Sequence, residues 1–171
     1  MTARARAALF VFGILTLALT GCTGPAPAEE AASTLTWEEA KADTQAMERQ
    51  IAALVPTEAV ISVDQNEKGG LFRCDEVQHR WKGITTVTLV PGADPESITK
   101  DMEQKIDTLF PAGEFEVTNR RGITDDYVAT VESPTTGEGY LFGQGRPGTI
   151  VIDSYSVCFT LPEGTYPGGD F

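Results

Sequence analysis

The first regular pattern in the chain is a spacing of three and four residues between apolar or small side chains across residues 36–55. This spacing places side chains on one face of a helix and therefore predicts an amphipathic α-helix. Thr36 and Glu39 have the residue types and spacing of a capping box at its start, and Pro56 ends it. The predicted buried face consists of Trp37, Ala40, Thr44, Met47, Ile51 and Leu54.

A second helical pattern begins at Asp94 and Pro95, which are residue types favoured at the N-cap and at the first helical position. Pro111 ends this pattern, because proline cannot continue a helix. The predicted buried face consists of Ile98, Met102, Ile106, Leu109 and Phe110.

Stretches rich in valine, isoleucine, threonine and aromatic residues predict β-strands between and after these helices. The predicted strands cover residues 59–63, 71–74, 81–90, 114–119, 127–131, 140–142 and 149–161. Because strands and helices do not alternate strictly, the order favours an α+β fold, a mainly antiparallel sheet with two helices packed on one face. A doubled α-β-β unit would also give this order, although no sequence repeat proves it.

The first 21 residues carry arginines and an apolar run but no acid. The apolar run, residues 9–19, is too short to span a hydrocarbon core of ~30 Å but is typical of a signal peptide. It ends in Leu19, Thr20, Gly21 and Cys22, which resemble the lipobox of bacterial lipoproteins. In that class the cysteine is diacylated and the peptide is cut before it. The alternative is an ordinary secretory signal with a chance cysteine.

These features predict four segments: a type II signal peptide over 1–21, a lipidated cysteine and flexible tether over 22–35, a single domain over 36–162 and a loose C-terminal tail over 163–171. Two or more acyl chains give stable membrane anchoring. We therefore expect a protein anchored to the cell membrane through its N-terminal lipid, with its domain on the extracytoplasmic side.

The chain is acidic, with 25 Asp and Glu against 13 Lys and Arg and a formal net charge of −12. This charge argues against binding nucleic acid, which depends largely on basic side chains at phosphates, and against electrostatic binding to anionic lipid. Solubility outside the cell is the ordinary explanation of such a charge. The alternative is an acidic patch that gathers cations or basic peptides.

With Cys22 lipidated, two cysteines remain, Cys74 and Cys158, both in predicted strands. A domain that folds outside the cytoplasm favours a disulfide between them. A redox-active pair more often has the close Cys-x-x-Cys spacing, so we expect a structural bond.

Three short features together resemble the LppA-type family of small actinobacterial lipoproteins: the lipobox, the segment 71–75 that contains Cys-Asp, and the segment 152–159 that ends in Cys-Phe. The resemblance covers residues 36–162 in layout, but only the short segments match in letters. It implies a cell-envelope lipoprotein of undefined biochemical role and no catalytic residues.

Two motifs suggest chemistry that their context does not support. Residues 143–148 match G-x-G-x-x-G, but Pro147 interrupts the motif and a strand follows where a dinucleotide site needs a helix, so we expect a hairpin loop. His79 is the only histidine, and it lies near Cys74. Because Cys74 has a disulfide partner, catalysis by this pair is not expected, and one histidine cannot supply a usual zinc ligand set.

Acidic residues are numerous, and paired carboxylates could in principle hydrolyse a glycoside. We expect a solvated acidic face instead, and no calcium-binding loop motif is present. The acids considered are Asp75, Glu76, Glu114, Glu116, Asp125 and Asp126.

Aromatic residues on the predicted strands give the best indication of binding. If several shared the face of the sheet that the helices leave uncovered, they would form a platform for a partner or ligand. Packing beneath the helices explains most of them. The candidates are Trp81, Tyr127, Tyr140, Phe142 and Tyr155.

The sequence thus predicts a non-enzymatic envelope lipoprotein, without a cofactor or metal, whose domain binds an envelope protein or a small ligand. An accessory glycan hydrolase that uses paired carboxylates, and a structural surface spacer, are the alternatives. Neither the partner nor the oligomeric state follows from the sequence.

Overall fold

The structure is a computed structural model in which residues 34–171 are described. The predictions for the signal peptide, for Leu19, Thr20, Gly21 and Cys22, and for most of the tether lie outside the described residues. The helices are α1 (Trp37–Ala52) and α2 (Pro95–Lys105), with short 3₁₀ turns at Thr57–Ala59 and Ile106–Thr108. The strands are β1 (Val60–Gln65), β2 (Gly70–Arg73), β3 (Gln78–Leu89), β4 (Glu116–Arg121), β5 (Tyr127–Glu132), β6 (Gly139–Gln144), β7 (Thr149–Tyr155) and β8 (Phe159–Thr160).

Both predicted helix starts are confirmed. The Thr36 hydroxyl accepts a hydrogen bond from the Glu39 N–H at 3.2 Å, and the Thr36 N–H donates to the Glu39 carboxylate at 2.9 Å. This reciprocal pair satisfies two backbone donors that α1 would otherwise leave unpaired. At α2 the Asp94 carboxylate accepts from the Glu96 N–H at 3.1 Å, and Pro95 occupies the first turn.

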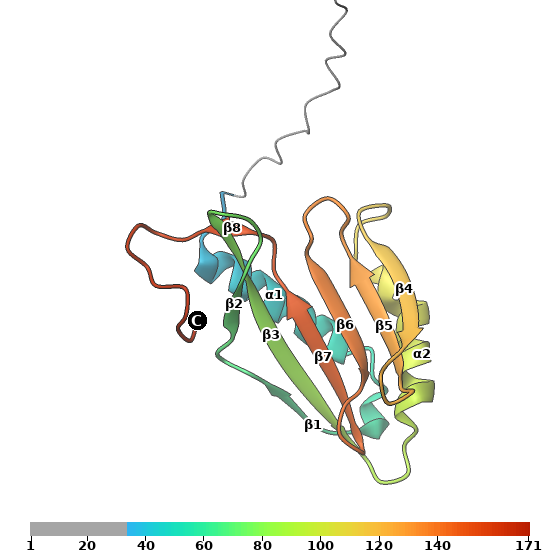
Figure 1. Ribbon diagram of the computed structural model, residues 1–171. Coiled ribbons are helices and arrows are strands. Elements are labelled where there is room, and N and C mark those ends of the chain that lie inside the picture. Colours follow the sequence, from blue (N-terminus) through green and yellow to red (C-terminus); the bar gives the residue numbers. More distant parts are fainter. Residues whose placement is uncertain (1–33) are drawn as a thin grey trace, which may run out of the picture. The chain divides into compact units, whose positions relative to one another are not determined.

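The eight strands form one antiparallel sheet in the order β1-β3-β7-β6-β5-β4, with β2 and β8 also paired to β3. Figure 1 shows both helices on the same face of this sheet. The predicted α+β fold is therefore confirmed. Three strands follow α1 and five follow α2, so the described chain does not divide into two equal α-β-β units.

The main hydrophobic core lies between the helices and the sheet. Alternate residues of each central strand point to this helix face, which is why the buried positions repeat with a period of two. Full burial of one such aliphatic side chain stabilises the fold by about 1.5–3 kcal/mol. Buried core residues include Ile51, Val87, Met102, Ile106, Ala129, Val131, Tyr140, Phe142, Ile150 and Ile152.

A second, smaller apolar cluster contains Trp81 and Phe159, and the end of the chain joins it. The ring of Phe171 packs edge-on against Trp37 with centroids 5.2 Å apart, and the Phe171 carbonyl accepts a hydrogen bond from the Trp81 indole at 3.2 Å. Phe171 and Gly69 also exchange backbone hydrogen bonds of 2.9 and 3.0 Å. The prediction of a loose tail over 163–171 is therefore wrong at its end, because an aromatic residue there completes this cluster.

The disulfide prediction is confirmed, since Cys74 and Cys158 are bonded with their Cα atoms 6.3 Å apart. Cys158 lies where the predicted final strand is interrupted, between β7 and β8. There the Ser156 hydroxyl accepts a hydrogen bond from the Trp81 N–H at 2.9 Å. The two cysteines are 84 residues apart in the sequence. In the chain-entropy model, a disulfide that closes a loop of this length stabilises the fold by roughly 4 kcal/mol.

One carboxylate of α1, that of Glu48, is buried between this helix and the sheet. Glu48 has no exposed surface, and it accepts hydrogen bonds from Gln65 of β1 at 2.7 Å, from Thr85 of β3 at 2.6 Å and from Ser154 of β7. A side chain at Gly83 would collide with this carboxylate and with the Trp81 ring. A carboxylate buried in this way is tolerated because its lone pairs are satisfied.

Replacing Glu48 by Ala should lower the free energy of unfolding by about 3 kcal/mol, because it leaves a cavity and leaves the two buried hydroxyls of Thr85 and Ser154 without their acceptor. Urea unfolding followed by circular dichroism measures this change. Glu38→Ala, which alters an exposed acid of the same helix, is the matched control and should change stability by less than about 0.5 kcal/mol. Equal effects of the two variants would show that the Glu48 network does not stabilise the fold.

Candidate binding site on the uncovered sheet face

Three of the five predicted platform aromatics belong to the core. Trp81, Tyr140 and Phe142 are at most 1% exposed and point to the helix face. As candidates for a binding platform these three are wrong, and the interpretation that most of the aromatics pack beneath the helices holds for them. Tyr127 also lies on the helix face, where its hydroxyl donates to Glu103 of α2. Tyr155 alone of the five points to the other face, because its neighbour Ser154 points to Glu48.

The face opposite the helices, here called the outer face, is covered by no helix of the described chain (Figure 1). Strand register determines which side chains meet on it. Tyr155 of β7 lies directly opposite Lys82 of β3, and Arg80 of β3 lies directly opposite Phe72 of β2. These four residues, together with Asp153, are called the outer-face cluster below.

The cluster is organised around the Tyr155 ring. The guanidinium of Arg80 lies over this ring at 4.6 Å from its centroid, and the Phe72 ring meets it edge-on at 5.8 Å. Lys82 lies 5.9 Å from the same centroid and forms an ion pair with Asp153. Cation–π and edge-to-face contacts of this kind hold the aromatic rings and the guanidinium in fixed orientations. The cluster is therefore a preorganised aromatic and cationic surface.

Hydrogen-bonding capacity remains on Arg80. One terminal nitrogen, Nη1, donates to the Gly137 carbonyl at 3.2 Å, and the other, Nη2, makes no hydrogen bond within residues 34–171. Nε is buried without a hydrogen-bond partner. Lys82 is neutralised locally by Asp153, but the Arg80 contacts are to a carbonyl and an aromatic ring. Because a guanidinium binds carboxylate and phosphate well, Arg80 gives this cluster a preference for anionic or carbonyl groups.

The outer face continues beyond the cluster as a half-buried apolar surface. Leu141 lies opposite Asp153, and Val151 lies opposite Gly143, which has no side chain. Threonines surround these residues on neighbouring strands. Phe72, at the cluster's rim, is 48% exposed. A partner could thus contact the cations, the aromatics and the apolar centre in one approach.

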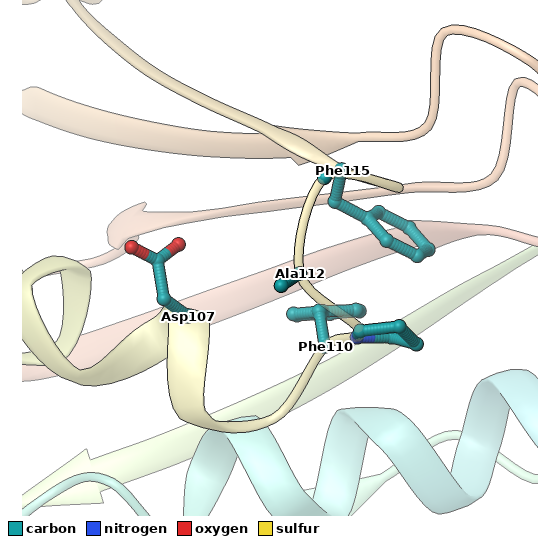
Figure 2. Close-up of a pocket in the computed structure, with 6 residues that line it drawn as sticks. Asp107, Phe110, Ala112 and Phe115 are labelled. Atoms are coloured by element: carbon teal, nitrogen blue, oxygen red, sulfur yellow. The ribbon is translucent and has the colours of Figure 1, made fainter.

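A small pocket of about 280 Å³ lies at a different place, in the turn between α2 and β4 (Figure 2). Its walls include Phe110 and Phe115, whose ring centroids are 4.4 Å apart, and a backbone turn through Pro111 and Gly113. Asp107 is the one carboxylate among its lining residues. The pocket therefore lacks the pair of acids that glycoside hydrolysis normally requires.

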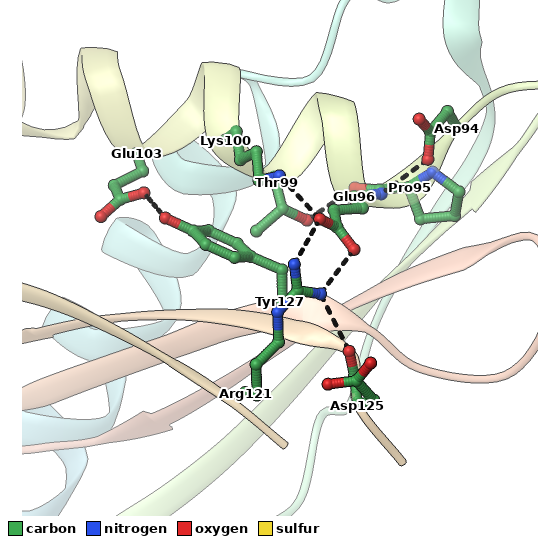
Figure 3. Close-up of polar contacts among 9 residues, drawn as sticks. All are labelled: Asp94, Pro95, Glu96, Thr99, Lys100, Glu103, Arg121, Asp125 and Tyr127. Atoms are coloured by element: carbon green, nitrogen blue, oxygen red, sulfur yellow. Dashed lines mark hydrogen bonds and ion pairs between the residues drawn. The ribbon is translucent and has the colours of Figure 1, made fainter. Parts of the chain in front are cut away.

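Another polar cluster joins α2 to β4 and β5 (Figure 3). Arg121 donates to both carboxylate oxygens of Glu96, at 2.8 and 2.9 Å, and Lys100 donates to one of them at 2.6 Å. The hydrogen bonds from Arg121 are the main reason why the pKa of Glu96 falls to about 2. Burial, with the Glu103 hydrogen bond, raises the pKa of Tyr127 to about 12. All these groups are paired with one another, so we interpret this cluster as a structural clamp.

The remaining motifs behave as the sequence predicts. Residues 143–148 form the β6–β7 hairpin, closed by a hydrogen bond from the Thr149 N–H to the Arg146 carbonyl at 2.9 Å, and no helix follows them. Cys74 is in the disulfide, so it offers no thiol to His79. The buried Nδ1 of His79 has no hydrogen-bond partner.

Two of the six acids noted in the sequence, Asp75 and Asp126, accept hydrogen bonds within turns. Asp75 accepts hydrogen bonds of 2.7 Å from the N–H groups of Val77 and Gln78, and these bonds lower its pKa. Asp126 accepts from Thr124 in the β4–β5 turn. No group of three His, Cys, Asp or Glu residues that would hold a metal ion occurs among the described residues.

Sequence reasoning missed Phe72, Arg80, Lys82 and Asp153 as members of one site. Each belongs to a predicted strand or lies beside one, but only the register of β2, β3 and β7 brings them together. Alternation along the strands would have separated Tyr155 from Tyr140 and Phe142, had the helix-covered face been known.

Comparisons with protein-family models, with curated proteins and with solved structures find no match to this chain. Within residues 34–171, neither helix is long and apolar enough to cross a membrane.

The Glu96 clamp predicts a specific dependence of stability on pH. Because folding lowers the pKa of Glu96 from 4.5 to about 2, its contribution to stability is complete above pH 4.5 and is lost as the pH falls towards 2. Glu96→Gln should therefore be less stable than the parent at pH 7, and this difference should shrink at pH values between 4.5 and 2. Urea unfolding at several pH values measures it.

The control for this experiment is Glu114→Gln, which alters an exposed acid in the turn before β4. The difference in free energy of unfolding between Glu114→Gln and the parent should not shrink between pH 4.5 and 2 as that of Glu96→Gln does. A Glu96→Gln difference that stays constant down to pH 2 would contradict the assigned clamp.

Proposed function

We propose that this chain is a non-enzymatic lipoprotein of the cell envelope, anchored through acylated Cys22, whose extracytoplasmic domain binds a partner through the outer-face cluster. The observation that carries the proposal is the concentration of Phe72, Arg80, Lys82 and Tyr155 on the uncovered face of the sheet. The disulfide between Cys74 and Cys158 is compatible with an extracytoplasmic location. The lipobox pattern and the resemblance to LppA-type lipoproteins support the anchor.

The partner chemistry follows from the cluster. Two cations and two aromatic rings stand together on a domain that is otherwise rich in acid, and Asp153 neutralises only Lys82. Such a surface suits a partner segment that presents a carboxylate beside an apolar group. The half-buried apolar surface around Leu141 and Val151 extends the contact area. A protein partner in the envelope fits this extent better than a small ligand, which normally occupies a concave pocket.

The anchor is tested at Cys22. Cys22→Ala should move the protein from the membrane fraction to a soluble or unprocessed form, because the residue that carries the acyl chains is lost. Fractionation with mass spectrometry of the N-terminal peptide measures this. A lipid-modified Cys22→Ala protein that stays in the membrane would overturn the anchor.

The binding face is tested by placing a photo-crosslinking amino acid at Phe72 in the full chain in intact cells. This residue is 48% exposed at the rim of the cluster, so illumination should give discrete adducts with a partner. Ile123, which is fully exposed in the β4–β5 turn, is the matched control position and should give none. Adducts that are absent at Phe72, or the same at both positions, would contradict the proposed face.

A further inference from the structure

The two edges of the sheet differ in how they are protected against pairing with a strand of another chain. Strand β4, at one edge, carries Glu116, Arg120 and Arg121, all exposed. Charged side chains on an edge strand discourage pairing with another chain. Strands β1 and β2 form the other edge, beside β3. Just before β2, Gly69 exchanges two backbone hydrogen bonds with residue 171.

Strand β1 places two exposed apolar residues at this edge. Its residues Ile61 and Val63 are 60% and 48% exposed, and the strand contains no lysine, arginine or proline. The strand does contain Asp64 and a bulge between Val60 and Ser62, two features that can blunt an edge. Its two exposed apolar residues nevertheless make it the candidate for strand pairing.

Backbone geometry shows which residues of β1 have groups free to pair. The Asn66 N–H donates to the Ile84 carbonyl of β3 at 3.0 Å. In an antiparallel ladder, alternate residues of a strand direct their N–H and C=O groups to the same neighbour. Ser62 and Asp64 therefore direct these groups to β3, and Val63 directs its groups outward. The register skips Ile61 at the bulge between Val60 and Ser62, so Ile61 has no partner on β3, and by the same alternation its groups, next to those of Ser62, point outward.

We propose that β1 pairs antiparallel with β1 of a second copy of this chain, with the two-fold axis at Ser62. In this register Ile61 of each copy lies opposite Val63 of the other, and Ser62 lies opposite itself. The outward backbone groups of Val63 meet those of Ile61, as the ladder requires. The interface is thus isologous, with the same residues contributed by both copies.

A second copy fits because this register pairs the exposed apolar residues of β1 with each other and brings no like charges directly opposite. Asp64 is the one charged residue of the strand, and in this register it lies opposite Val60 of the other copy. The two Asp64 residues are then offset by four residues, or about 13 Å along the strands, which exceeds the Debye length of about 8 Å at physiological ionic strength. A basic extended peptide is the competing occupant, and the tests below distinguish it.

Disulfide trapping tests the register in the full chain, with Cys22 replaced by Ser in every variant. Ser62→Cys should form a covalent dimer on mild oxidation, because a residue opposite itself in a non-hydrogen-bonded pair has its Cα atoms about 4.5 Å apart. Asp64→Cys is the matched control on the same strand, and it should crosslink several-fold less. Absence of a Ser62→Cys dimer, or equal crosslinking of the two variants, would overturn the proposal.

Sedimentation equilibrium in a density-matched detergent tests the association itself. The parent should dimerise at protein concentrations below about 1 mM, more strongly as salt is raised, because salt screens the repulsion between two copies of net charge −12. Val63→Lys should abolish the dimer, and Ile123→Lys, the same kind of change at a remote exposed site, should not. The proposal is overturned if the parent is monomeric at all concentrations, including the case in which it binds only basic peptides. It is also overturned if Val63→Lys leaves the dimer unchanged.

Discussion

The arrangement of α1 on the sheet depends on one buried carboxylate. Glu48 accepts hydrogen bonds from β1, β3 and β7, so a single side chain connects the helix to three strands. A shift of α1 along the sheet would disturb its apolar packing, and it would also leave the carboxylate and its donors unpaired in the core. The network thus fixes the helix in one position.

Several features follow from that position. A glycine is needed at residue 83 because the carboxylate and the Trp81 ring occupy the space above it. Trp81 then forms the small cluster with Ala40 of α1 and Phe159 of β8, and its indole binds the carbonyl of residue 171. Ser154 must also point to the helix face, which directs Tyr155 to the outer face. The buried network and the outer-face cluster are therefore determined by the same alternation of side chains along β7.

The local elements could be predicted from the sequence because their signals are local. The Thr36–Glu39 capping box and the Asp94–Pro95 start were both predicted correctly. The disulfide joins residues 84 apart, and it could be predicted only because two cysteines remain once Cys22 is assigned to the anchor. Properties that depend on strand order and register could not be predicted in this way. The aromatic candidates were assigned without knowledge of which face the helices cover, so most proved to belong to the core. The fixed position of Phe171 depends on a tertiary contact with Trp37, for which the tail sequence carries no signal.

Strand β3 connects the two proposed surfaces. It pairs with the open edge strand β1 near one end, and it contributes Arg80 and Lys82 to the outer-face cluster near the other. In an antiparallel pair, residues directly opposite each other point to the same side of the sheet. A dimer formed through β1 would therefore continue the sheet with both outer faces on one side, and it would present two copies of the cluster together. Two weak contacts made to one partner, or to two partners held in the same envelope, would then reinforce each other through their effective concentration. The gain in binding affinity is greatest for a flat site without a deep pocket, because each contact alone buries little surface.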